Sequence, residues 1–271
     1  MKTKREVIGL IPAGGKASRI SPLPCSKELF PLGFRSVDNH KKLRPKVISH
    51  YLLERLRLAD IKKAYIILRK GKWDIPSYFG DGKLVNMHLA YLMMDLPYGV
   101  PYTLDQAYPF VKDSLIALGF PDLIFHPEDA YKKLLNKLEE SGAEIVLGLF
   151  HPSQPHKTDM VEIDEDGRIR EIHIKPDNLH LEYAWEIAVW TPVFTEYMHE
   201  YLISHLEVFK QKERFANDQN TYELHVADVI RSALKDSMRI DSVLFKEGSS
   251  IDIGTPEDLI KAIESTNQVS E

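Results

Sequence analysis

A glycine-rich segment near the N-terminus carries the residues best suited to bind an anion. It reads IPAGGKASRISPLPCSKELFP over residues 11–31. The consecutive glycines Gly14 and Gly15 let a backbone turn sharply and bring its N–H groups close to a ligand. Arg19 and Lys27 add a planar guanidinium and a movable ammonium, a combination that suits a triphosphate. The same residues could equally form a tight turn with two solvated cations.

Two well-defined phosphate loops are excluded by the spacing of these residues. The segment does not fit G-x-x-x-x-G-K-[ST], so it is not a P-loop. It also lacks the third glycine of G-x-G-x-x-G, the fingerprint of dinucleotide binding.

Two aspartates stand where a divalent cation could be held. Asp122 follows the apolar run Leu115–Leu118, at the C-terminal end of an expected core strand, where open α/β sheets bind ligands. Asp252 lies in the segment SIDIGTPED, residues 250–258. Mg²⁺ prefers one or two carboxylates together with substrate phosphates. Alone, each aspartate could be solvated or take part in helix capping, but together with residues 11–31 they favour a metal site.

The glycine-rich segment resembles the signature of the sugar-1-phosphate nucleotidyltransferases, above all the glucose-1-phosphate thymidylyltransferase type. The family pattern A-G-G-x-G-T-R-L-x-P, followed by K-x-L-x-P, corresponds to residues 13–22 and 27–31. The resemblance implies that Arg19 stabilises charge at the reacting α-phosphorus and that Lys27 grips the triphosphate. It implies nucleotide contacts for Ala13, Gly14 and Gly15.

The resemblance extends over most of the chain and implies further site residues. Asp122 falls in the counterpart of the family's G-D-x-x-F element, and Asp252 in that of its D-x-G-T segment, so both are expected to hold Mg²⁺ and Asp122 also to contact the nucleotide. Gly99 begins the element whose backbone approaches base and sugar. Lys175, in Ile174-Lys175-Pro176, corresponds to the lysine of E-K-P that holds the sugar phosphate.

Several positions depart from the family pattern, mainly on the substrate side. Ala17 replaces a family glycine, and the loop before Lys27 is two residues shorter. Met94 replaces the glutamine that reads the base, and a thioether cannot reproduce the paired contacts of an amide. The remaining replacements are Ile174 for the glutamate of E-K-P, Asp159 for a glycine and Glu186-Ile187 for a T-G pair.

These departures shape the expected activity. The resemblance implies Mg²⁺-dependent formation of a nucleoside diphosphate sugar and pyrophosphate from a sugar 1-phosphate and a triphosphate, with dTTP favoured and UTP or CTP possible. Asp159 and Glu186 would suit a sugar with a cationic substituent on charge grounds. Two alternatives stay open: cytidylyl transfer to a phosphate that is not a hexose phosphate, and a nucleotide-binding regulatory relative without turnover.

The pattern of apolar residues predicts the elements that position these side chains. Short apolar runs alternate with segments of helical period, which predicts a doubly wound, mostly parallel Rossmann-like α/β sheet flanked by helices, with a smaller antiparallel substrate-side region. Predicted strands cover residues 7–11, 64–68, 115–118, 144–150, 184–190 and 242–245, with a hairpin at 160–163 and 169–174 around the turn Asp164-Glu165-Asp166-Gly167. Predicted helices cover residues 47–58, 127–140, 196–209, 223–234 and 256–265.

Length and composition bound the remaining expectations. The 271 residues predict a single domain. The resemblance implies that it is a nucleotidyltransferase domain with a nucleotide-binding core at 1–150, a sugar-phosphate part at 151–250 and the metal-aspartate segment and last helix at 251–271. A formal net charge of -5 argues against a nucleic-acid partner. Cys25 is the only cysteine, and no apolar stretch approaches the ~20 residues of a membrane helix, so we expect a cytoplasmic protein without a membrane partner. Homo-oligomerisation is possible.

Overall fold

The computed structural model describes residues 5–36, 42–94, 98–165, 167–177, 180–215 and 223–268. Its strands are β1 (Val7–Ala13), β2 (Pro31–Ser36), β3 (Leu43–Val47), β4 (Lys63–Arg69), β5 (His88–Met94), β6 (Leu115–Leu118), β7 (Leu123–His126), β8 (Ile145–Pro152), β9 (Met160–Ile163), β10 (Ile169–His173), β11 (Tyr183–Trp190) and β12 (Ile240–Asp252). Its α-helices are α1 (Ile48–Leu58), α2 (Asp74–Phe79), α3 (Val100–Asp105), α4 (Tyr108–Val111), α5 (Ala130–Ser141), α6 (Pro192–Phe215), α7 (Val226–Lys235) and α8 (Pro256–Gln268). Short 3-10 helices are η1 (Lys27–Leu29), η2 (Lys83–Val85) and η3 (Pro155–Lys157).

Ten of these strands form one sheet around which the chain is organised. The order is β5-β4-β1-β6-β11-β8-β12-β7, and the β9–β10 hairpin joins at β11. β5, β4, β1 and β6 are parallel, whereas β11 is antiparallel to both β6 and β8. β1 is an almost continuous buried run because helices cover both faces of the sheet at this point. The predicted fold class is therefore confirmed.

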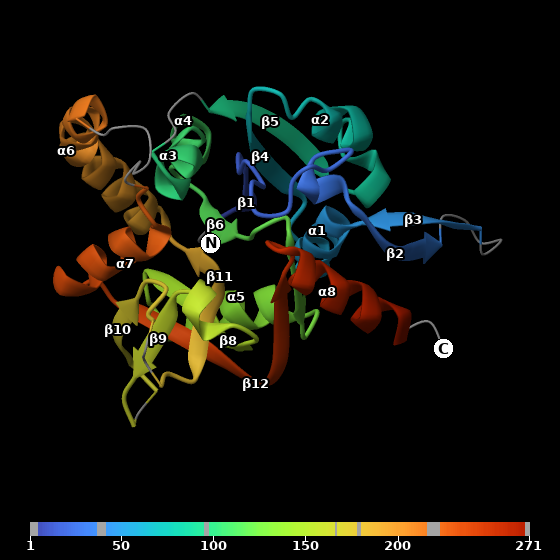
Figure 1. Cartoon of the computed structure of the whole chain (residues 1–271). Helices are drawn as coiled ribbons and strands as arrows, with labels where there is room; N and C mark the ends of the chain where they lie inside the picture. Colours follow the sequence, from blue (N-terminus) through green and yellow to red (C-terminus); the bar gives the residue numbers. More distant parts are fainter. Residues whose placement is uncertain are drawn as a thin grey trace.

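Two apolar cores lie on opposite faces of the sheet. One packs α3, α6 and α7 against it through side chains such as Tyr102, Phe194 and Ile230. The other packs α1, α2 and α5 through Leu53, Phe79 and Leu134 among others. Figure 1 shows α3, α6 and α7 on the left of the view and α1, α2 and α8 on the right. This layering leaves the ends of the strands free to carry a site.

The predicted elements are all present, and the largest difference in extent is in the last strand. β6 has the predicted bounds, and the hairpin at β9 and β10 is confirmed, although Asp166 of its turn lies outside the described residues. The last strand, predicted as four residues, extends over Ile240–Asp252 and delivers Asp252 to the sheet edge. The β2–β3 arm, β5, β7 and the short helices α2, α3 and α4 were not predicted from the apolar pattern.

His50 on α1 predicts how stability varies with pH. The side chain is 1% exposed, and its Nδ1 accepts a hydrogen bond from the backbone N–H of Val47 at 3.2 Å. Burial, with smaller contributions from the charges of Arg35 and Lys46, lowers the pKa of His50 to about 4. The unfolded chain therefore takes up a proton first as the pH falls below about 6.5, so stability contributed by neutral His50 is lost toward pH 4.

We expect His50 to lower the free energy of unfolding by about 2 kcal/mol when the pH falls from 7 to 5. Urea denaturation at both pH values measures the loss. His50→Gln keeps an acceptor for the Val47 N–H but has no proton to gain, so the variant should lose about 2 kcal/mol less than the wild type. Equal losses in the two proteins would show that His50 is protonated within the fold.

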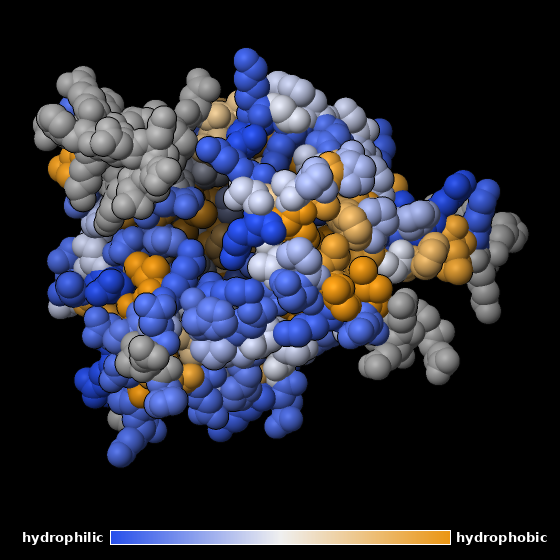
Figure 2. All heavy atoms as spheres, in the orientation of Figure 1, coloured by the Kyte–Doolittle hydropathy of each residue, from blue (hydrophilic) through white to orange (hydrophobic). Residues whose placement is uncertain are grey.

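Apolar side chains gather on the surface at one end of the molecule. Figure 2 shows them over α8 and the β2–β3 arm, where Phe34, Leu43, Ile260 and Ile263 are exposed. Such a patch is compatible with self-association, and homo-oligomerisation stays a prediction. Within the described residues, every helix is too short or too polar to cross a membrane.

Candidate active site

The glycine-rich segment after β1 lies against the last residue of β5. A methyl group on Gly14 would come within 2.6 Å of Met94 Sδ, so the thioether approaches closely because this residue is glycine. The Met94 sulfur also accepts a hydrogen bond from Thr103 Oγ1 of α3 at 3.1 Å. A methyl group on Gly15 would meet no atom within 4 Å, so the backbone there borders open space. Gly14 and Met94 are therefore neighbours, while the nucleotide contacts of Gly14, Gly15 and Met94 stay a prediction.

Gly99 joins the start of α3 to the segment before α7. Its φ is +115°, a conformation that favours glycine, and a methyl group there would overlap the carbonyl oxygen of Leu224. The two residues form a β-bridge, and the Leu224 N–H donates to the carbonyl of Tyr98 at 2.9 Å. The structure therefore explains Gly99 by close backbone packing, while its predicted contact with a nucleotide stays a prediction.

Ala17 shows why the family has glycine at its position. Its φ is +53°, in the left-handed region. Its carbonyl oxygen accepts hydrogen bonds from the N–H groups of Ile20 and Ser21, at 3.1 and 3.0 Å, and from Ser21 Oγ at 2.9 Å. A tight turn therefore encloses Arg19, and the alanine carries backbone strain that a glycine would not.

Ala17→Gly should stabilise the protein by about 0.5–1 kcal/mol, because relief of the strained φ exceeds the entropy that glycine gains in the unfolded chain. Thermal or urea unfolding measures the change. Ala59→Gly is the matched control: Ala59 has an ordinary φ of -86°, so the same substitution there should destabilise. Destabilisation at both positions would show that Ala17 is not strained.

Lys27 and Asp122 form a largely buried ion pair at the edge of the sheet. Lys27 begins η1, and Asp122 lies between β6 and β7; their side chains are 12% and 20% exposed. Burial disfavours the charged lysine, but Asp122 and Asp252 outweigh it and raise the pKa of Lys27. Burial likewise opposes ionisation of Asp122, yet the Lys27 ammonium holds its pKa below the ordinary value. The structure thus brings the predicted cation and carboxylate into contact.

Asp252 and Arg19 complete this group from opposite ends of the chain. A methyl group on Gly254 would lie 2.9 Å from Arg19 Nη2 and 3.0 Å from Asp252 Oδ2, so both side chains approach the same glycine. Removal from water and the nearby charge of Asp122 raise the pKa of Asp252 to about 6. Two carboxylates that repel each other beside open solvent are a donor set that fits a hard divalent cation.

A second buried pair supports η1 and was not predicted. The Lys72 Nζ donates to Glu28 Oε1 at 2.5 Å, and both side chains are buried. Glu28 Oε2 is buried and has no hydrogen-bond partner among the described residues, and Glu28 and Ser49 border a small cavity. In the sequence, Glu28 stands out only because it follows Lys27 in KELFP. No residue near Lys72 indicates that this lysine pairs with Glu28.

Asp159 and Lys175 meet at the open end of the β9–β10 hairpin. Lys175 has a φ of +42°, and its positive charge acts on the Asp159 carboxylate. Asp159 Oδ1 is buried and lacks a hydrogen-bond partner in the described part of the chain. Burial raises the pKa of Asp159, although the charges of His225 and Lys175 act in the opposite direction. Two residues predicted to bind the sugar phosphate are therefore neighbours.

Glu186 links the two groups electrostatically. It lies in β11, and its Oε1 accepts a hydrogen bond from Ser250 Oγ of β12 at 3.3 Å. Burial and then the charges of Asp252 and Asp159 raise its pKa to about 8. The predicted site residues on the catalytic and substrate sides therefore form one continuous charged region.

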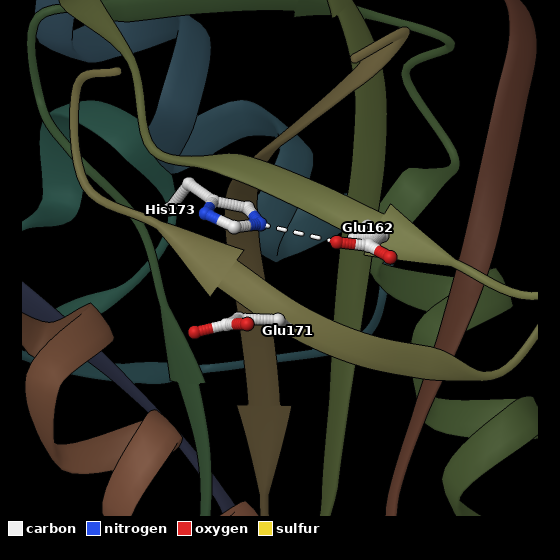
Figure 3. Close-up of side chains that lie close together, drawn as sticks. All are labelled: Glu162, Glu171 and His173. Atoms are coloured by element: carbon white, nitrogen blue, oxygen red, sulfur yellow. Dashed lines mark hydrogen bonds and ion pairs between the residues drawn. The ribbon is translucent and has the colours of Figure 1, made fainter. Parts of the chain in front are cut away.

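A separate group of ionisable side chains lies on the β9–β10 hairpin. Figure 3 shows Glu162, Glu171 and His173, whose potential ligand atoms all lie within 4.8 Å of one another. His173 Nε2 is 3.2 Å from Glu162 Oε2, and Arg231 Nη2 is 3.4 Å from Glu171 Oε1. Both glutamates are exposed and already paired, which is typical of a surface ion-pair network.

Comparisons of sequence match the chain to a known family and to relatives. The model of a family described as nucleotidyl transferase matches residues 8–269. The low-salt glycan biosynthesis nucleotidyltransferase of Haloferax volcanii is 25% identical over 258 residues, which cover 94% of this chain and 64% of that protein, so the chain spans just under two thirds of that relative. The glucose-1-phosphate thymidylyltransferase of Neisseria gonorrhoeae is 24% identical over 257 residues, covering 94% of this chain and 80% of the relative.

Solved structures of low sequence identity share the fold. A Bacillus anthracis protein assigned as a glucose-1-phosphate thymidylyltransferase superposes with a TM-score of 0.77 at 21% identity, covering 98% of this chain and 97% of the other. A UDP-glucose pyrophosphorylase complexed with UDP-glucose superposes with a TM-score of 0.73 at 16% identity, covering 97% and 99%. At these identities the likeness concerns the fold alone.

Proposed function

Because the chain belongs to the nucleotidyl transferase family, we propose that it transfers a nucleotidyl group from a nucleoside triphosphate to a sugar 1-phosphate and releases pyrophosphate. The observation that carries this proposal is the meeting of Lys27 and Arg19 with Asp122 and Asp252 at one edge of the sheet. Cations and metal-binding carboxylates in one place are what phosphoryl-type transfer requires, since the chemistry depends on positioning and charge neutralisation.

The proposed reaction needs no general base from the protein. A phosphate oxygen of the acceptor attacks the α-phosphorus, the bond from that phosphorus to the bridging oxygen of the β-phosphate breaks, and pyrophosphate leaves. Arg19 would offset the charge that grows at the α-phosphorus, and Lys27 would hold the triphosphate. Lys175 would hold the attacking phosphate in line.

Asp122 and Asp252 are the residues that would hold a divalent metal, for which we propose Mg²⁺. When bound, the ion supplies neutralisation of triphosphate charge. Lys27 pairs with Asp122, and the charges of Lys27 and Arg19 act on Asp252. The protein's own contribution is to hold two acids and two cations together at fixed positions.

The base is the least determined part of the proposal. We propose dTTP as the favoured donor, in line with the thymidylyltransferase relatives, with UTP or CTP as alternatives. Met94 stands where the resemblance places a base-reading amide, and its sulfur, which accepts from Thr103, offers the base no donor–acceptor pair. This departure keeps cytidylyl transfer to another phosphate as an alternative. Retention of the cations and carboxylates argues against a regulatory relative without turnover.

A thermal-shift panel tests the donor directly, because a bound ligand stabilises the fold by mass action. We expect Mg²⁺ with one pyrimidine triphosphate among dTTP, UTP and CTP to raise the melting temperature more than ATP or GTP does. The same triphosphate should give pyrophosphate when a sugar 1-phosphate is added. Equal shifts with all five nucleotides, or none with any, would contradict a specific nucleotide site.

A further inference from the structure

Glu186 occupies an irregular position in the middle of the sheet. In β11, Trp185 pairs with Leu149 of β8, but Ile187 pairs with the adjacent Gly148, so Glu186 is the extra residue of a β-bulge. Trp185 packs in the core that contains α3, α6 and α7, whereas Ile187 packs in the opposite core. Bulges of this kind re-aim a side chain next to functional sites. Here the residue that is re-aimed is an acid.

Gly148 shows that the bulge is accommodated by its neighbours. A methyl group on Gly148 would lie 2.6 Å from Ile187 Cγ1, so the absence of a side chain makes room for Ile187 beside the bulge. The partner strand is therefore shaped to keep Glu186 where it is, although this places a half-buried carboxyl group inside a sheet.

The surroundings of Glu186 supply little to compensate its charge. The ionisable groups that act on it most strongly are Asp252, Asp159 and Asp122, and the hydroxyl of Ser250 donates a hydrogen bond to it at 3.3 Å. Asp159 differs, because Lys175 and His225 offset its charge. A half-buried acid among acids is costly unless a cation arrives to pair with it.

Asp159 connects Glu186 with the proposed phosphate-binding lysine. Its backbone carbonyl accepts a hydrogen bond from the N–H of Trp185, the residue before Glu186, at 3.3 Å. The positive charge of Lys175 acts on its carboxylate. An acceptor whose phosphate lies at Lys175 would therefore extend past Asp159 toward Glu186, and its far substituent would meet an acid.

We propose that Glu186 selects a phosphate acceptor that carries an ammonium group, with Asp159 lining the same pocket. This inference rests on the proposed function, because it names the substrate class of that site. Two sources share this chemistry: an amino sugar 1-phosphate and the phosphate of an amino alcohol. In both, the phosphate oxygen is the nucleophile and the ammonium pairs with Glu186 without taking part in bond making.

Binding of matched acceptors tests the proposal without requiring turnover. Isothermal titration is done on the full chain with Mg²⁺ and an unreactive α,β-methylene triphosphate. Glucosamine 1-phosphate is compared with glucose 1-phosphate, and ethanolamine phosphate with the phosphate of ethylene glycol. We expect the ammonium member of one pair to bind at least about tenfold more tightly than its neutral partner, and that pair identifies the source.

Variants connect the preference to Glu186. Glu186→Gln should abolish the tenfold preference, and Glu186→Thr, which restores the residue of the family pattern, should also improve binding of the neutral member. Glu140→Gln, which removes an exposed acid from α5, should leave the preference unchanged. Either Glu186 variant suffices if the other does not fold.

Three outcomes would overturn the proposal. The first is equal binding within both pairs, including no binding of any acceptor. The second is an ammonium preference that survives Glu186→Gln. The third is a Glu186→Gln protein that binds Mn²⁺ about tenfold more weakly while keeping the preference, which would make Glu186 a metal ligand. Failure of the proposed function is distinct, since it would appear as absent pyrophosphate release whatever the acceptor affinities are.

Discussion

Replacing Arg19 by alanine is expected to lower turnover by about three powers of ten or more while the fold is kept. Arginines that offset charge in phosphoryl transfer contribute factors of this size. Arg19 is exposed and lies over Gly254, beside Asp252, where it can reach a triphosphate without supporting any core. Pyrophosphate release under saturating substrates measures the loss, and a thermal melt reports the fold.

Two further variants separate a direct role of Arg19 from a general effect of charge. Arg57→Ala removes an exposed arginine of α1 remote from the glycine-rich segment, and should leave turnover within about twofold of the wild type. Gly254→Ala adds a methyl group 2.9 Å from Arg19 Nη2 and should displace the guanidinium, with an intermediate loss of activity. A folded Arg19→Ala protein with near wild-type turnover would remove Arg19 from the mechanism.

Replacing Asp252 by asparagine is expected to lower turnover roughly a thousandfold, since metal neutralisation of a transferring phosphate is equivalent to several kcal/mol. The substitution keeps the shape of the side chain but removes one of the two carboxylates that would hold the metal. Activity measured as a function of Mg²⁺ concentration should show weaker metal binding together with the lower plateau.

The same variant should be more stable than the wild type in EDTA at pH 8. Desolvation and Asp122 raise the pKa of Asp252 to about 6, so its ionised form destabilises the metal-free fold above that pH. This destabilisation by ionised Asp252 develops as the pH rises from about 4 to about 6. It disappears below pH 4, where the Asp252 carboxyl is protonated in both the folded and the unfolded protein. Identical melting temperatures of the two proteins at pH 8 would show that Asp252 is not strained by Asp122.

The central elements of the fold were predictable because burial on both faces leaves a clear apolar signal. Leu115–Leu118 is an uninterrupted apolar run between Ser114 and Gly119, and the predicted bounds of this strand are the observed ones. The full length of β12 was not predicted, because its residues 246–250 are KEGSS and its register with β8 is irregular between Leu244 and Ser249. A polar strand held in place by its neighbours gives no periodic signal.

The site was predictable in its residue types and less so in its geometry. Motif spacing identified Arg19, Lys27, Asp122 and Asp252, and the structure brings their side chains together. The left-handed Ala17 and the bulge at Glu186 depend on backbone conformation set by tertiary contacts, which no local pattern encodes.

³¹P NMR of one complete reaction tests nucleotidyl transfer most directly. The protein is mixed with Mg²⁺, the triphosphate that gives the largest thermal shift and the acceptor that binds most tightly. We expect the triphosphate resonances to disappear as pyrophosphate and a nucleoside diphosphate ester of the acceptor appear in equal amounts, and we expect Arg19→Ala to prevent this. An intact triphosphate in the presence of bound acceptor, or its hydrolysis to orthophosphate, would contradict nucleotidyl transfer.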